Sequence, residues 1–476
     1  MESVAAAVTR LEALAATAPL AALADRFAAA GHELALVGGP VRDAFLGRAV
    51  NDLDLATSAR PDDIIRIVKP VADAHWDIGR AFGTIGARLG EHTVEITTYR
   101  ADAYSPDSRK PEVAFGDSLE GDLVRRDFTI NAMALRLPAR TLVDPSGGLD
   151  DLFARRLMTP GRPDDSFGDD PLRMLRAARF ASQLEVEVDP AVIEAMGRMR
   201  DRLSIVSAER VRDELVKLLG TAAPRRGLAL LVDTGLAALV VPELPALRLE
   251  VDEHAHHKDV YEHSLTVLEQ AIELETEREP DAAPDIVLRL AALLHDIGKP
   301  ATKRVEPGGA VTFHHHDVVG AKLARKRLTA LRFDKETIGA VSRLIELHLR
   351  FFGYSDAPWT DSGVRRYVRD ADALLERLHI LTRADVTTRN RRKEARLRGA
   401  YDELERRIAE LAELEELQAI RPDLDGEQIM ALLDVRPGPV VGEAYRFLLE
   451  QRLDEGPLGE VEAERRLREW FAQRAG

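Results

Sequence analysis

The stretch LVGGPVRDAFLGRAVNDLDLAT constrains the fold of this 476-residue chain more than any other part of it. An apolar run precedes two adjacent glycines, a short amphipathic run follows, and aspartate then alternates with leucine. This order predicts strand, glycine turn, helix and strand over residues 34–57. Residues two apart in a strand point the same way, so Asp52 and Asp54 share one face and the leucines beside them face the core.

The paired aspartates favour a site for a hard cation. Two ionised carboxylates this close repel each other, and a divalent ion such as Mg²⁺ relieves the repulsion. Gly38 and Gly39 let the backbone approach a ligand, and Pro40 suits the first turn of a helix whose free N–H groups face an anion. Arg42 adds a charge-assisted contact. These parts together describe a nucleoside triphosphate held by metal; an acidic strand end after an ordinary glycine turn is the alternative.

Composition limits the class of protein. Hydrophobic residues make up 45% of the chain, yet no apolar run approaches the ~18 residues of a membrane span, so we expect no membrane partner. The chain has no cysteine, so any metal must bind His, Asp or Glu, and a reducing cytoplasm is the expected location. The net charge of −15 argues against a generally basic nucleic-acid binder but allows a local basic face.

The pattern along the chain predicts an α+β fold. We read the Ala-rich N-terminus as helix, and TIGARLG and HTVEITTYR alternate with period two, as half-buried antiparallel strands do. Residues 102–121 are polar and rich in Pro and Gly, which predicts a loop. After Leu152 the pattern is helical almost to the end. The expected breaks lie near 242–245, 279–284, 307–309 and 436–442.

Two further motifs carry arginines suited to nucleotides. In RRDFTINAMAL, Arg126 offers a planar fork for phosphate, while Asp127 and Asn131 either cap a helix or meet a ribose hydroxyl. In DDPLRMLRAARF, Asp170 and Arg173 are one turn apart. From there we expect the same helix face to continue, at three-residue steps, through Arg176 and Arg179.

The acid and the arginine of the second motif suit two bases. Cytosine and adenine each present an amino donor beside a ring-nitrogen acceptor, which an Asp and an Arg complement. Uracil and guanine reverse this pattern, and each unsatisfied buried group costs ~1 to 3 kcal/mol. Two side chains can thus specify C and A without a nucleic-acid template. A helix N-cap is the alternative role for Asp170, since Pro171 follows it.

The three motifs occur in the order and rough spacing of the class II tRNA nucleotidyltransferase and bacterial poly(A) polymerase family, which the first 190 or so residues resemble closely. The resemblance implies a polymerase-β-like head in which Asp52 and Asp54 bind Mg²⁺ and carry catalysis. It also implies nucleotide contacts from residues of all three motifs. These residues are Gly39, Arg42, Arg126, Asp170, Arg173, Arg176 and Arg179. Glu95 is a candidate third carboxylate, with surface exposure as the alternative explanation.

A second set of residues lies far downstream. An adjacent His-Asp, with further His residues on surrounding helical segments, suits a metal site of nitrogen and oxygen ligands. The order resembles that of HD-superfamily phosphohydrolases, which implies one or two divalent ions that activate water. The implied ligands are His263, His295, Asp296, His316, His348 and Asp385. His314 or His315 could replace His316, and a site that has lost its metal and only packs is the alternative.

We therefore predict four parts: a nucleotidyltransferase head (1–158), a helical neck with the base-reading helix (159–250), an HD domain (251–390) and a helical tail that contacts RNA (391–476). The predicted activity is addition of C, C and A to the tRNA 3′ end from CTP and ATP. Poly(A) polymerase, or addition of only CC or only A, are the alternatives on the same motifs. An HD phosphohydrolase with a degenerate RNA-binding head is the alternative of another class.

Overall fold

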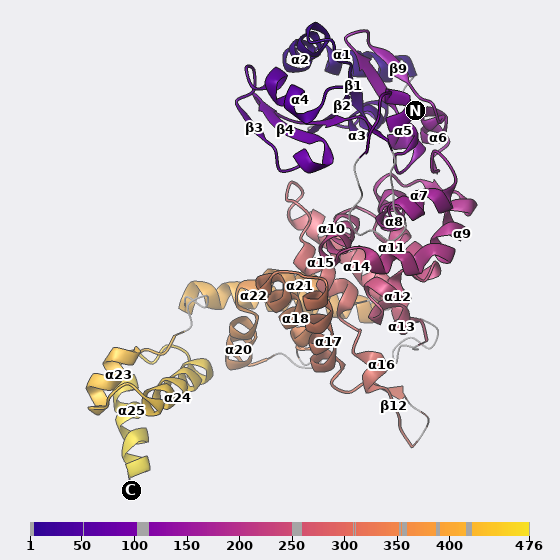
Figure 1. Cartoon of the computed structure of the whole chain (residues 1–476). Helices are drawn as coiled ribbons and strands as arrows, with labels where there is room; N and C mark the ends of the chain where they lie inside the picture. The colour runs from indigo at the N-terminus through magenta and orange to yellow at the C-terminus, as the bar shows by residue number, and fades with distance from the viewer. Residues whose placement is uncertain are drawn as a thin grey trace. The chain divides into compact units, whose positions relative to one another are not determined.

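The computed structural model describes residues 4–50, 52–101, 114–249, 259–307, 311–351, 359–386, 391–415 and 421–475, together with Gly309 and Tyr354. The chain forms two compact units, Met1–Val240 and Val241–Gly476, and each is described by itself. The first contains the main sheet and the second is almost entirely helical (Figure 1). This arrangement confirms the predicted α+β fold.

A seven-stranded mixed sheet in the order β3-β4-β5-β2-β1-β8-β9 forms the centre of the first unit. β2 pairs in parallel with β5 and antiparallel with β1, so the strand that carries the aspartates lies inside the sheet. The antiparallel pairing predicted for the segments after residue 84 is confirmed for β4 and β5. The strands are β1 (Leu34–Val37), β2 (Asp52–Thr57), β3 (Ala74–Trp76), β4 (Thr84–Leu89), β5 (His92–Thr98), β8 (Ala134–Leu137) and β9 (Thr141–Val143).

The helices of the first unit cover this sheet and then continue as a helical neck. The Ala-rich N-terminus forms two helices, because Pro19 starts a new first turn. The helices are α1 (Val4–Ala15), α2 (Ala18–Ala29), α3 (Gly39–Phe45), α4 (Pro61–Val68), α5 (Leu119–Val124), α6 (Gly148–Phe153), α7 (Pro163–Asp169), α8 (Leu172–Gln183), α9 (Pro190–Met199), α10 (Ala208–Leu219), α11 (Arg225–Asp233) and α12 (Ala237–Val240). Short pairs β6 (Arg100–Ala101) with β7 (Ala114–Phe115) and β10 (Arg156–Leu157) with β11 (Glu187–Val188) complete it.

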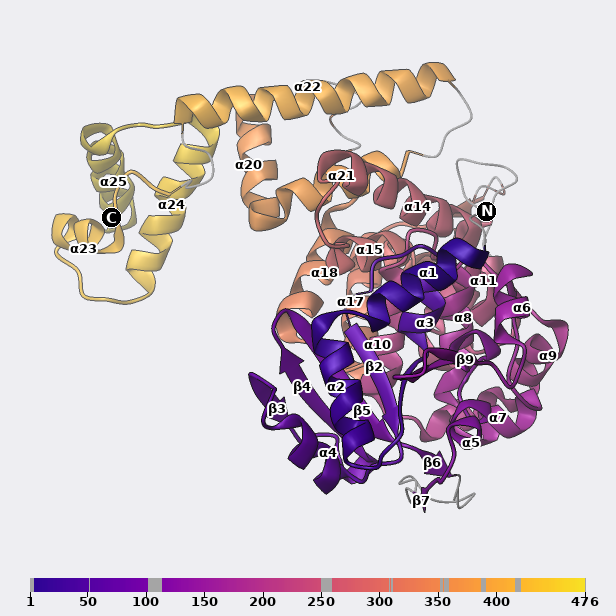
Figure 2. The ribbon, with the colours of Figure 1, turned by 90° about the horizontal axis from the view of Figure 1, so that it is seen from above.

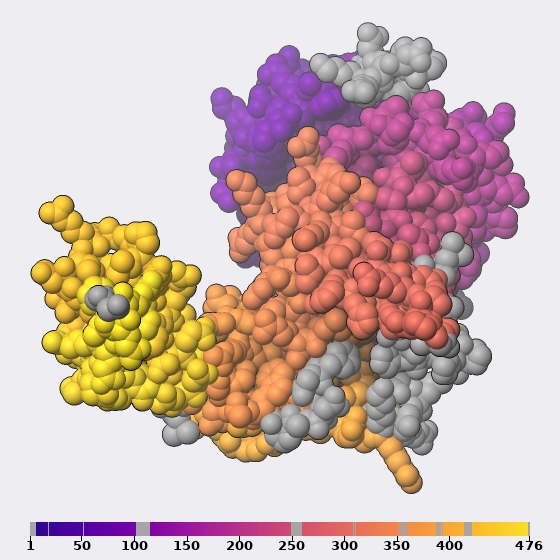
Figure 3. Space-filling view, turned by 90° about the horizontal axis from the view of Figure 1, so that it is seen from below, coloured from indigo at the N-terminus to yellow at the C-terminus, as the bar shows by residue number. Residues whose placement is uncertain are grey.

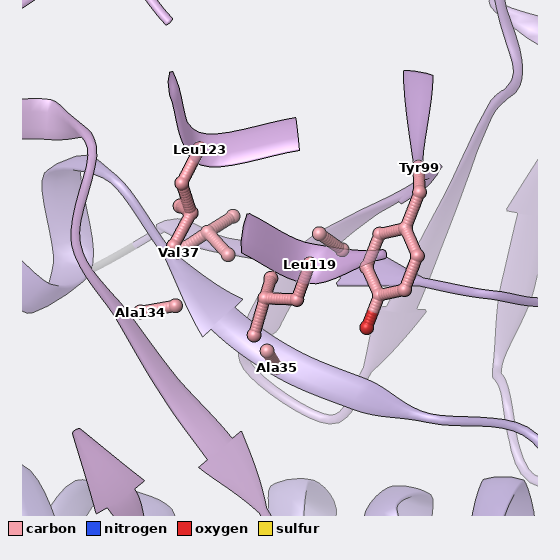
Figure 4. Close-up of a cluster of buried hydrophobic side chains, with 7 residues drawn as sticks. Ala35, Val37, Tyr99, Leu119, Leu123 and Ala134 are labelled. Atoms are coloured by element: carbon pink, nitrogen blue, oxygen red, sulfur yellow. The ribbon is translucent and has the colours of Figure 1, made fainter. Parts of the chain in front are cut away.

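Apolar side chains of β1 pack directly under α5. Ala35 and Val37 of β1 contact Leu119 and Leu123 of α5 in a cluster that also contains Tyr99, and all of these are fully buried (Figure 4). The packing fixes α5 on the sheet, and α5 ends just before the predicted phosphate-binding Arg126.

The loop predicted over residues 102–121 is wrong at its C-terminal end. β7 occupies Ala114–Phe115, and α5 begins at Leu119 with the hydroxyl of Ser118 accepting a hydrogen bond from Gly121 N. Ser118 is an N-cap, and the apolar residues behind it supply the buried face that the polar composition hid. Residues 102–113 lie outside the described residues.

The second unit is a set of packed helices, and its long helix α22 lies alongside α20 and α21 (Figure 2). In the space-filling view its orange segments pack closely against one another (Figure 3). The helices are α13 (Glu243–Ala246), α14 (Val260–Arg278), α15 (Ile286–Leu294), α16 (Lys299–Thr302), α17 (His316–Ala330), α18 (Lys335–Leu347), α20 (Asp361–Ala371), α21 (Leu375–Ala384), α22 (Arg391–Glu415), α23 (Gly426–Leu433), α24 (Pro439–Glu455) and α25 (Glu460–Ala475).

Two of the predicted breaks are shorter than expected. α13 forms inside the first break, and α24 begins at Pro439, because proline is well tolerated in the first turn of a helix. The small hairpin of β12 (Arg304–Val305) and β13 (Val311–Thr312) was not predicted. Among the described residues no single helix has the length and apolar composition to span a membrane; one bent pair, Ala6–Ala15 with Pro19–Ala29, meets these criteria only when both helices are counted together.

Candidate active site and candidate metal centre

The two aspartates lie on one face of β2, as predicted. Asp52 is exposed and Asp54 is half-buried, while the leucines that alternate with them are buried. The parallel pairing of β2 with β5 places Glu95 directly opposite Asp54. Burial raises the pKa of Asp54 to about 6, and the charges of Glu95 and Asp52 add to the rise. Three carboxylates so arranged repel one another, and a bound cation would relieve this repulsion.

The glycine turn lies against Arg126. Gly38 has φ +72° and is followed by α3, whose first turn contains Pro40. A Cβ on Gly38 would lie 3.0 Å from Nη1 of Arg126, so only glycine accommodates both the backbone angle and the guanidinium. Arg126 is anchored by Asp122, at 3.2 Å, and its charge lowers the pKa of Asp54. The guanidinium of Arg126 therefore lies close to the glycine turn and close enough to Asp54 to affect its charge.

Arg42 is buried, with 5% of its surface exposed, and is held by neighbours inside the protein. It makes a bidentate contact with Asp43, at 2.9 Å for both bonds, and donates from Nη1 to Oδ1 of Asn131 at 2.6 Å. The side-chain amide of Asn131 in turn donates to Oδ1 of Asp127 at 3.1 Å. Asp127 and Asn131 thus hold Arg42 in place through a chain of hydrogen bonds. The sequence had suggested two other roles for these residues, a helix cap or a contact to a ribose hydroxyl.

The predicted base-reading pair lies at the junction of α7 and α8. Asp170 precedes α8; its Oδ1 accepts from Leu172 N at 3.1 Å and its Oδ2 accepts from Arg210 at 2.8 Å. Arg173 donates to the hydroxyl of Ser166 at 2.9 Å and to the carbonyl of Arg125 at 2.6 Å. The hydrogen bond to the start of α8 that the Asp-Pro order suggested is therefore present. It uses one oxygen of the Asp170 carboxylate, and the other oxygen binds Arg210.

Arg176 and Arg179 lie next to each other on α8, since both approach Glu214, at 3.8 and 2.7 Å, but of the three arginines of this helix only Arg173 lines the pocket described below. Each residue of an α-helix turns about 100°, so three-residue steps fall behind a full turn by about 60° each. Arg176 binds Asp127, with Nε at 2.7 Å and Nη2 at 2.5 Å, and Arg179 is buried against Glu214 of α10 at 2.7 Å. In the structure, both guanidinium groups join elements of the protein; the nucleotide contacts predicted for them stay predictions.

A pocket of about 390 Å³ opens beside these residues within the first unit. Its lining includes Arg126, which contacts the glycine turn, and Ser166, Asp169 and Arg173 from the neck. Other arginines of its wall are Arg100, Arg125 and Arg162. Three aspartates, Asp117, Asp165 and Asp169, also line it, so the arginines leave a modest excess of positive charge on a polar wall, which suits a phosphorylated ligand.

The six predicted HD residues come together in the second unit from five separate segments. Two groups have ligand atoms within 4.8 Å of one another: His263 with His295 and Asp385, and Asp296 with His316 and His348. His314 and His315 are exposed, so His316 is the member of the HHH run that enters the cluster. Asp296 lies 3.5 Å from His263 and 3.2 Å from His316, which places its carboxylate between the two groups.

Backbone carbonyls fix the orientation of three of these imidazole rings. Nδ1 of His295, His316 and His348 lies 2.9, 2.8 and 2.6 Å from the carbonyl three residues earlier. Carbonyls only accept, so each Nδ1 carries a proton and the neutral ring keeps its lone pair on Nε2, facing the cluster. His348 Nε2 is buried and has no hydrogen-bond partner among the described residues. This donor set fits a divalent cation.

Charge in the cluster is strongly coupled. Burial opposes ionisation, yet Asp296 and Asp385 raise the pKa of His295 to about 10. Despite burial, the charges and hydrogen bonds of the histidines hold the pKa of both aspartates well below the usual value. Burial and the His295 charge lower the pKa of His348 to about 4. In the protein without metal, protonated His295 thus balances one of the two carboxylate charges. Lys299 adds a second cation, 2.8 Å from Asp296.

Three family models match the chain in succession. Residues 34–158 match the poly(A) polymerase head domain, residues 185–247 match the probable RNA- and SrmB-binding site of polymerase A, and residues 260–390 match the HD domain. Over 435 residues the chain is 37% identical to the A-adding tRNA nucleotidyltransferase of Deinococcus radiodurans, covering 90% of this chain and 92% of that protein.

The chain belongs to the tRNA nucleotidyltransferase family. It is likewise 32% identical to the CC-adding tRNA nucleotidyltransferase of Thermus thermophilus, over 90% of this chain and 91% of that one. The CCA-adding enzyme of Bacillus subtilis is 43% identical over 44% of this chain and 51% of its own length. This nucleotidyltransferase also resembles the crystal structure of the Bacillus stearothermophilus CCA-adding enzyme in complex with CTP, with a TM-score of 0.67, 25% identity and coverage of 96% and 98%.

Sequence reasoning missed two residues that hold the site together. Glu214 of α10 is buried and receives Arg179, and its position on the apolar face of an amphipathic helix was the signal that it needed a partner. Ser166 is buried and receives Arg173. No local pattern marks Ser166, because α7 and α8 must pack before the contact exists.

Proposed function

We propose that this nucleotidyltransferase adds C, C and A to the 3′ end of tRNA, with CTP and ATP as substrates. One observation carries the proposal: Asp52, Asp54 and Glu95 lie together beside a glycine turn that is in contact with Arg126. The printed activities of the related proteins, which add A, CC or CCA, support tRNA as the acceptor.

We infer that Asp52 and Asp54 hold Mg²⁺, with Glu95 as the neighbouring carboxylate. When bound, the ion lowers the charge on the triphosphate and favours ionisation of the attacking 3′-hydroxyl. The backbone at Gly38 and Gly39 lets the phosphates approach α3, and Arg126 neutralises part of their charge. Arg42 orients this helix through Asn131.

Base choice is assigned to Asp170 and Arg173. The carboxylate accepts from the amino group of C or A, and the guanidinium donates to the ring nitrogen beside it. Asp170 has one oxygen on Arg210 and the other on Leu172 N, and each oxygen keeps a further lone pair for a base. Arg173 and Arg126 line the same pocket, which supports contacts from both arginines to one ligand.

Extension of three transfer RNAs tests the proposal. The acceptors end before the first C, after the first C and after the second C, and each is incubated with CTP, ATP, UTP or GTP alone. The proposal predicts C, C and then A at the respective ends, with UTP and GTP rejected. Tailing of unrelated RNA with ATP alone would instead identify a poly(A) polymerase.

Addition of A alone is the second candidate. The observation in its favour is the relative of 37% identity that spans nearly the whole chain and is named for A addition. In the same assay, this candidate predicts extension of only the acceptor that already ends in CC. Addition of CC alone would leave that acceptor unchanged.

For the second unit we propose a divalent-metal site at the six clustered residues, with hydrolysis of phosphate esters as its activity. The three Nε2 lone pairs and the two carboxylates are the support. Metal-dependent release of phosphate from an aryl phosphate ester, lost on Asp296→Ala and retained on Asp54→Ala, tests this assignment.

We also propose the division into head (1–158), neck (159–250), HD domain (251–390) and tail (391–476), which the spans of the three family models support. We further propose that the protein is located in the cytoplasm, which the absence of cysteine supports.

A further inference from the structure

The guanidinium of Arg173 is held by three acceptors from two other elements. Nη1 donates to the hydroxyl of Ser166 at 2.9 Å and, at 3.4 Å, to the backbone carbonyl of the same residue, on α7. Nη2 donates to the backbone carbonyl of Arg125 at 2.6 Å, at the end of α5. A planar group fixed at two of its nitrogens cannot rotate about its long axis. The plane of the arginine is therefore set by α5 and α7 as well as by its own helix.

The hydroxyl of Ser166 faces Arg173. It is buried, with 7% of its surface exposed, and lies on the pocket wall beside Arg173. α7 packs against both α8 and α9, so the position of the hydroxyl is fixed by the neck. The carbonyls of Arg125 and Ser166 belong to the backbone and are present in any variant, and the Ser166 hydroxyl is the closer of the two acceptors of Nη1. Ser166 is thus the side chain on which the orientation of Arg173 depends.

We propose that Ser166 is a positioning residue that sets the choice between nucleotides. The inference rests on the proposed base-reading role of Arg173. A guanidinium has five N–H groups; with Nη1 and Nη2 committed, the donors left for a base point in fixed directions. A fixed donor meets the ring nitrogen of C or A but meets an N–H of U or G. Without Ser166 the guanidinium can turn, and uridine can then enter with its carbonyl accepting.

The test measures kcat/KM for CTP, ATP, UTP and GTP in the Ser166→Ala and Ser166→Cys variants of the whole chain. Cysteine keeps the size of serine but is a weak acceptor. We expect the preference for CTP over UTP to fall by about tenfold in both variants, which corresponds to about 1.4 kcal/mol. Ser166→Thr, which keeps the hydroxyl, should restore the preference.

Ser182→Ala is the matched control. Ser182 is also buried, on α8, but its hydroxyl accepts from Gly227 N at 2.8 Å and does not line the pocket. Its loss should lower the melting temperature and leave the CTP to UTP preference unchanged.

Two results would overturn the inference: a preference within twofold of the wild type in the Ala and Cys variants, or an equal fall of kcat/KM for all four nucleotides. In either case a wild-type chain that extends tRNA still supports the proposed function. A wild-type chain that incorporates neither C nor A would defeat the proposed function itself.

Discussion

Glu95 lies directly opposite Asp54 in the register of the parallel strands β2 and β5. Parallel strands bring residues from distant parts of the chain onto one face, and here they add a third carboxylate to the pair of β2. Replacing Glu95 with Gln keeps the size of the side chain and removes its charge. We expect kcat for nucleotide addition to fall by about tenfold or more, because metal binding loses a neighbouring negative charge.

Glu91→Gln is the control for this change. Glu91 is an exposed acid in the turn just before β5, outside the paired residues of β2 and β5, and its loss should leave kcat unchanged. Activity of Glu95→Gln equal to that of Glu91→Gln at saturating Mg²⁺ would remove Glu95 from the site.

Gly38→Ala should weaken nucleotide binding. The substitution strains a backbone at φ +72° and pushes a Cβ to 3.0 Å from Arg126 Nη1, so the guanidinium must move away from the turn. The backbone strain costs about 1 to 2 kcal/mol of folding free energy, and the displaced charge raises KM for CTP and ATP. Steady-state kinetics and thermal unfolding separate the two effects.

Gly90→Ala isolates the cost of the backbone angle. Gly90 has φ +61° in the β4–β5 hairpin, and a Cβ there meets no described atom within 4 Å. This variant should lose stability through the positive φ alone and keep the wild-type KM. If Gly38→Ala also keeps the wild-type KM, the contact between the turn and Arg126 has no role in nucleotide binding.

Much of this geometry could be predicted from local sequence. The strand, glycine turn, helix and strand follow from patterns within 25 or so residues, and the structure has all of them. Asp52 and Asp54 share a face because strand geometry alone requires it. The partners of the arginines could not be predicted in this way. Glu214 and Asp127 reach Arg179 and Arg176 only through packing of segments about 35 and 49 residues away.

The HD residues show the same limit. The residue types and their order predicted the six metal ligands. They did not decide which of the adjacent histidines, His314, His315 or His316, is one of them. His315 adopts φ +63° as the N-cap of α17, which turns His316 inward and leaves His314 and His315 exposed. The backbone angle at His315, and not the residue type, therefore determines which of the three histidines enters the cluster.

Asp127→Asn should destabilise the first unit in a pH-dependent way. Although burial opposes it, Arg176 lowers the pKa of Asp127 to about 2. A lowered folded-state pKa adds stability above the unfolded value of about 3.9, and this stability is lost as pH falls from there through about 2. At pH 7 we expect a loss of about 2 kcal/mol in the free energy of unfolding, and a smaller difference from wild type below pH 4.

Urea unfolding at pH 7 and pH 2 measures this difference, with Asp164→Asn as the control. Asp164 also pairs with an arginine, Arg198 at 2.9 Å, but that pair is exposed, so its loss should change stability little. Equal effects of the two substitutions at pH 7 would contradict a buried, stabilising role for the Asp127 contact with Arg176.

His348→Ala should weaken divalent-metal binding in the second unit. His348 Nε2 is buried without a hydrogen-bond partner among the described residues and completes the group of Asp296 and His316. We expect affinity to fall on the order of tenfold or more, measured as metal per chain after dialysis against a weak chelator. His314→Ala, an exposed neighbour of the same run, should retain wild-type metal. Equal metal content in both variants would place any bound ion elsewhere.

Extension of tRNA by the Asp54→Ala variant tests the central claim most directly. Asp54 is half-buried among like charges, so its removal should leave the fold intact, which the melting temperature checks. The account predicts that wild-type protein extends a tRNA lacking its 3′-terminal nucleotides and that the folded Asp54→Ala protein does not. Extension by this variant at the wild-type rate would contradict the claim that the carboxylates beside the glycine turn carry nucleotide transfer.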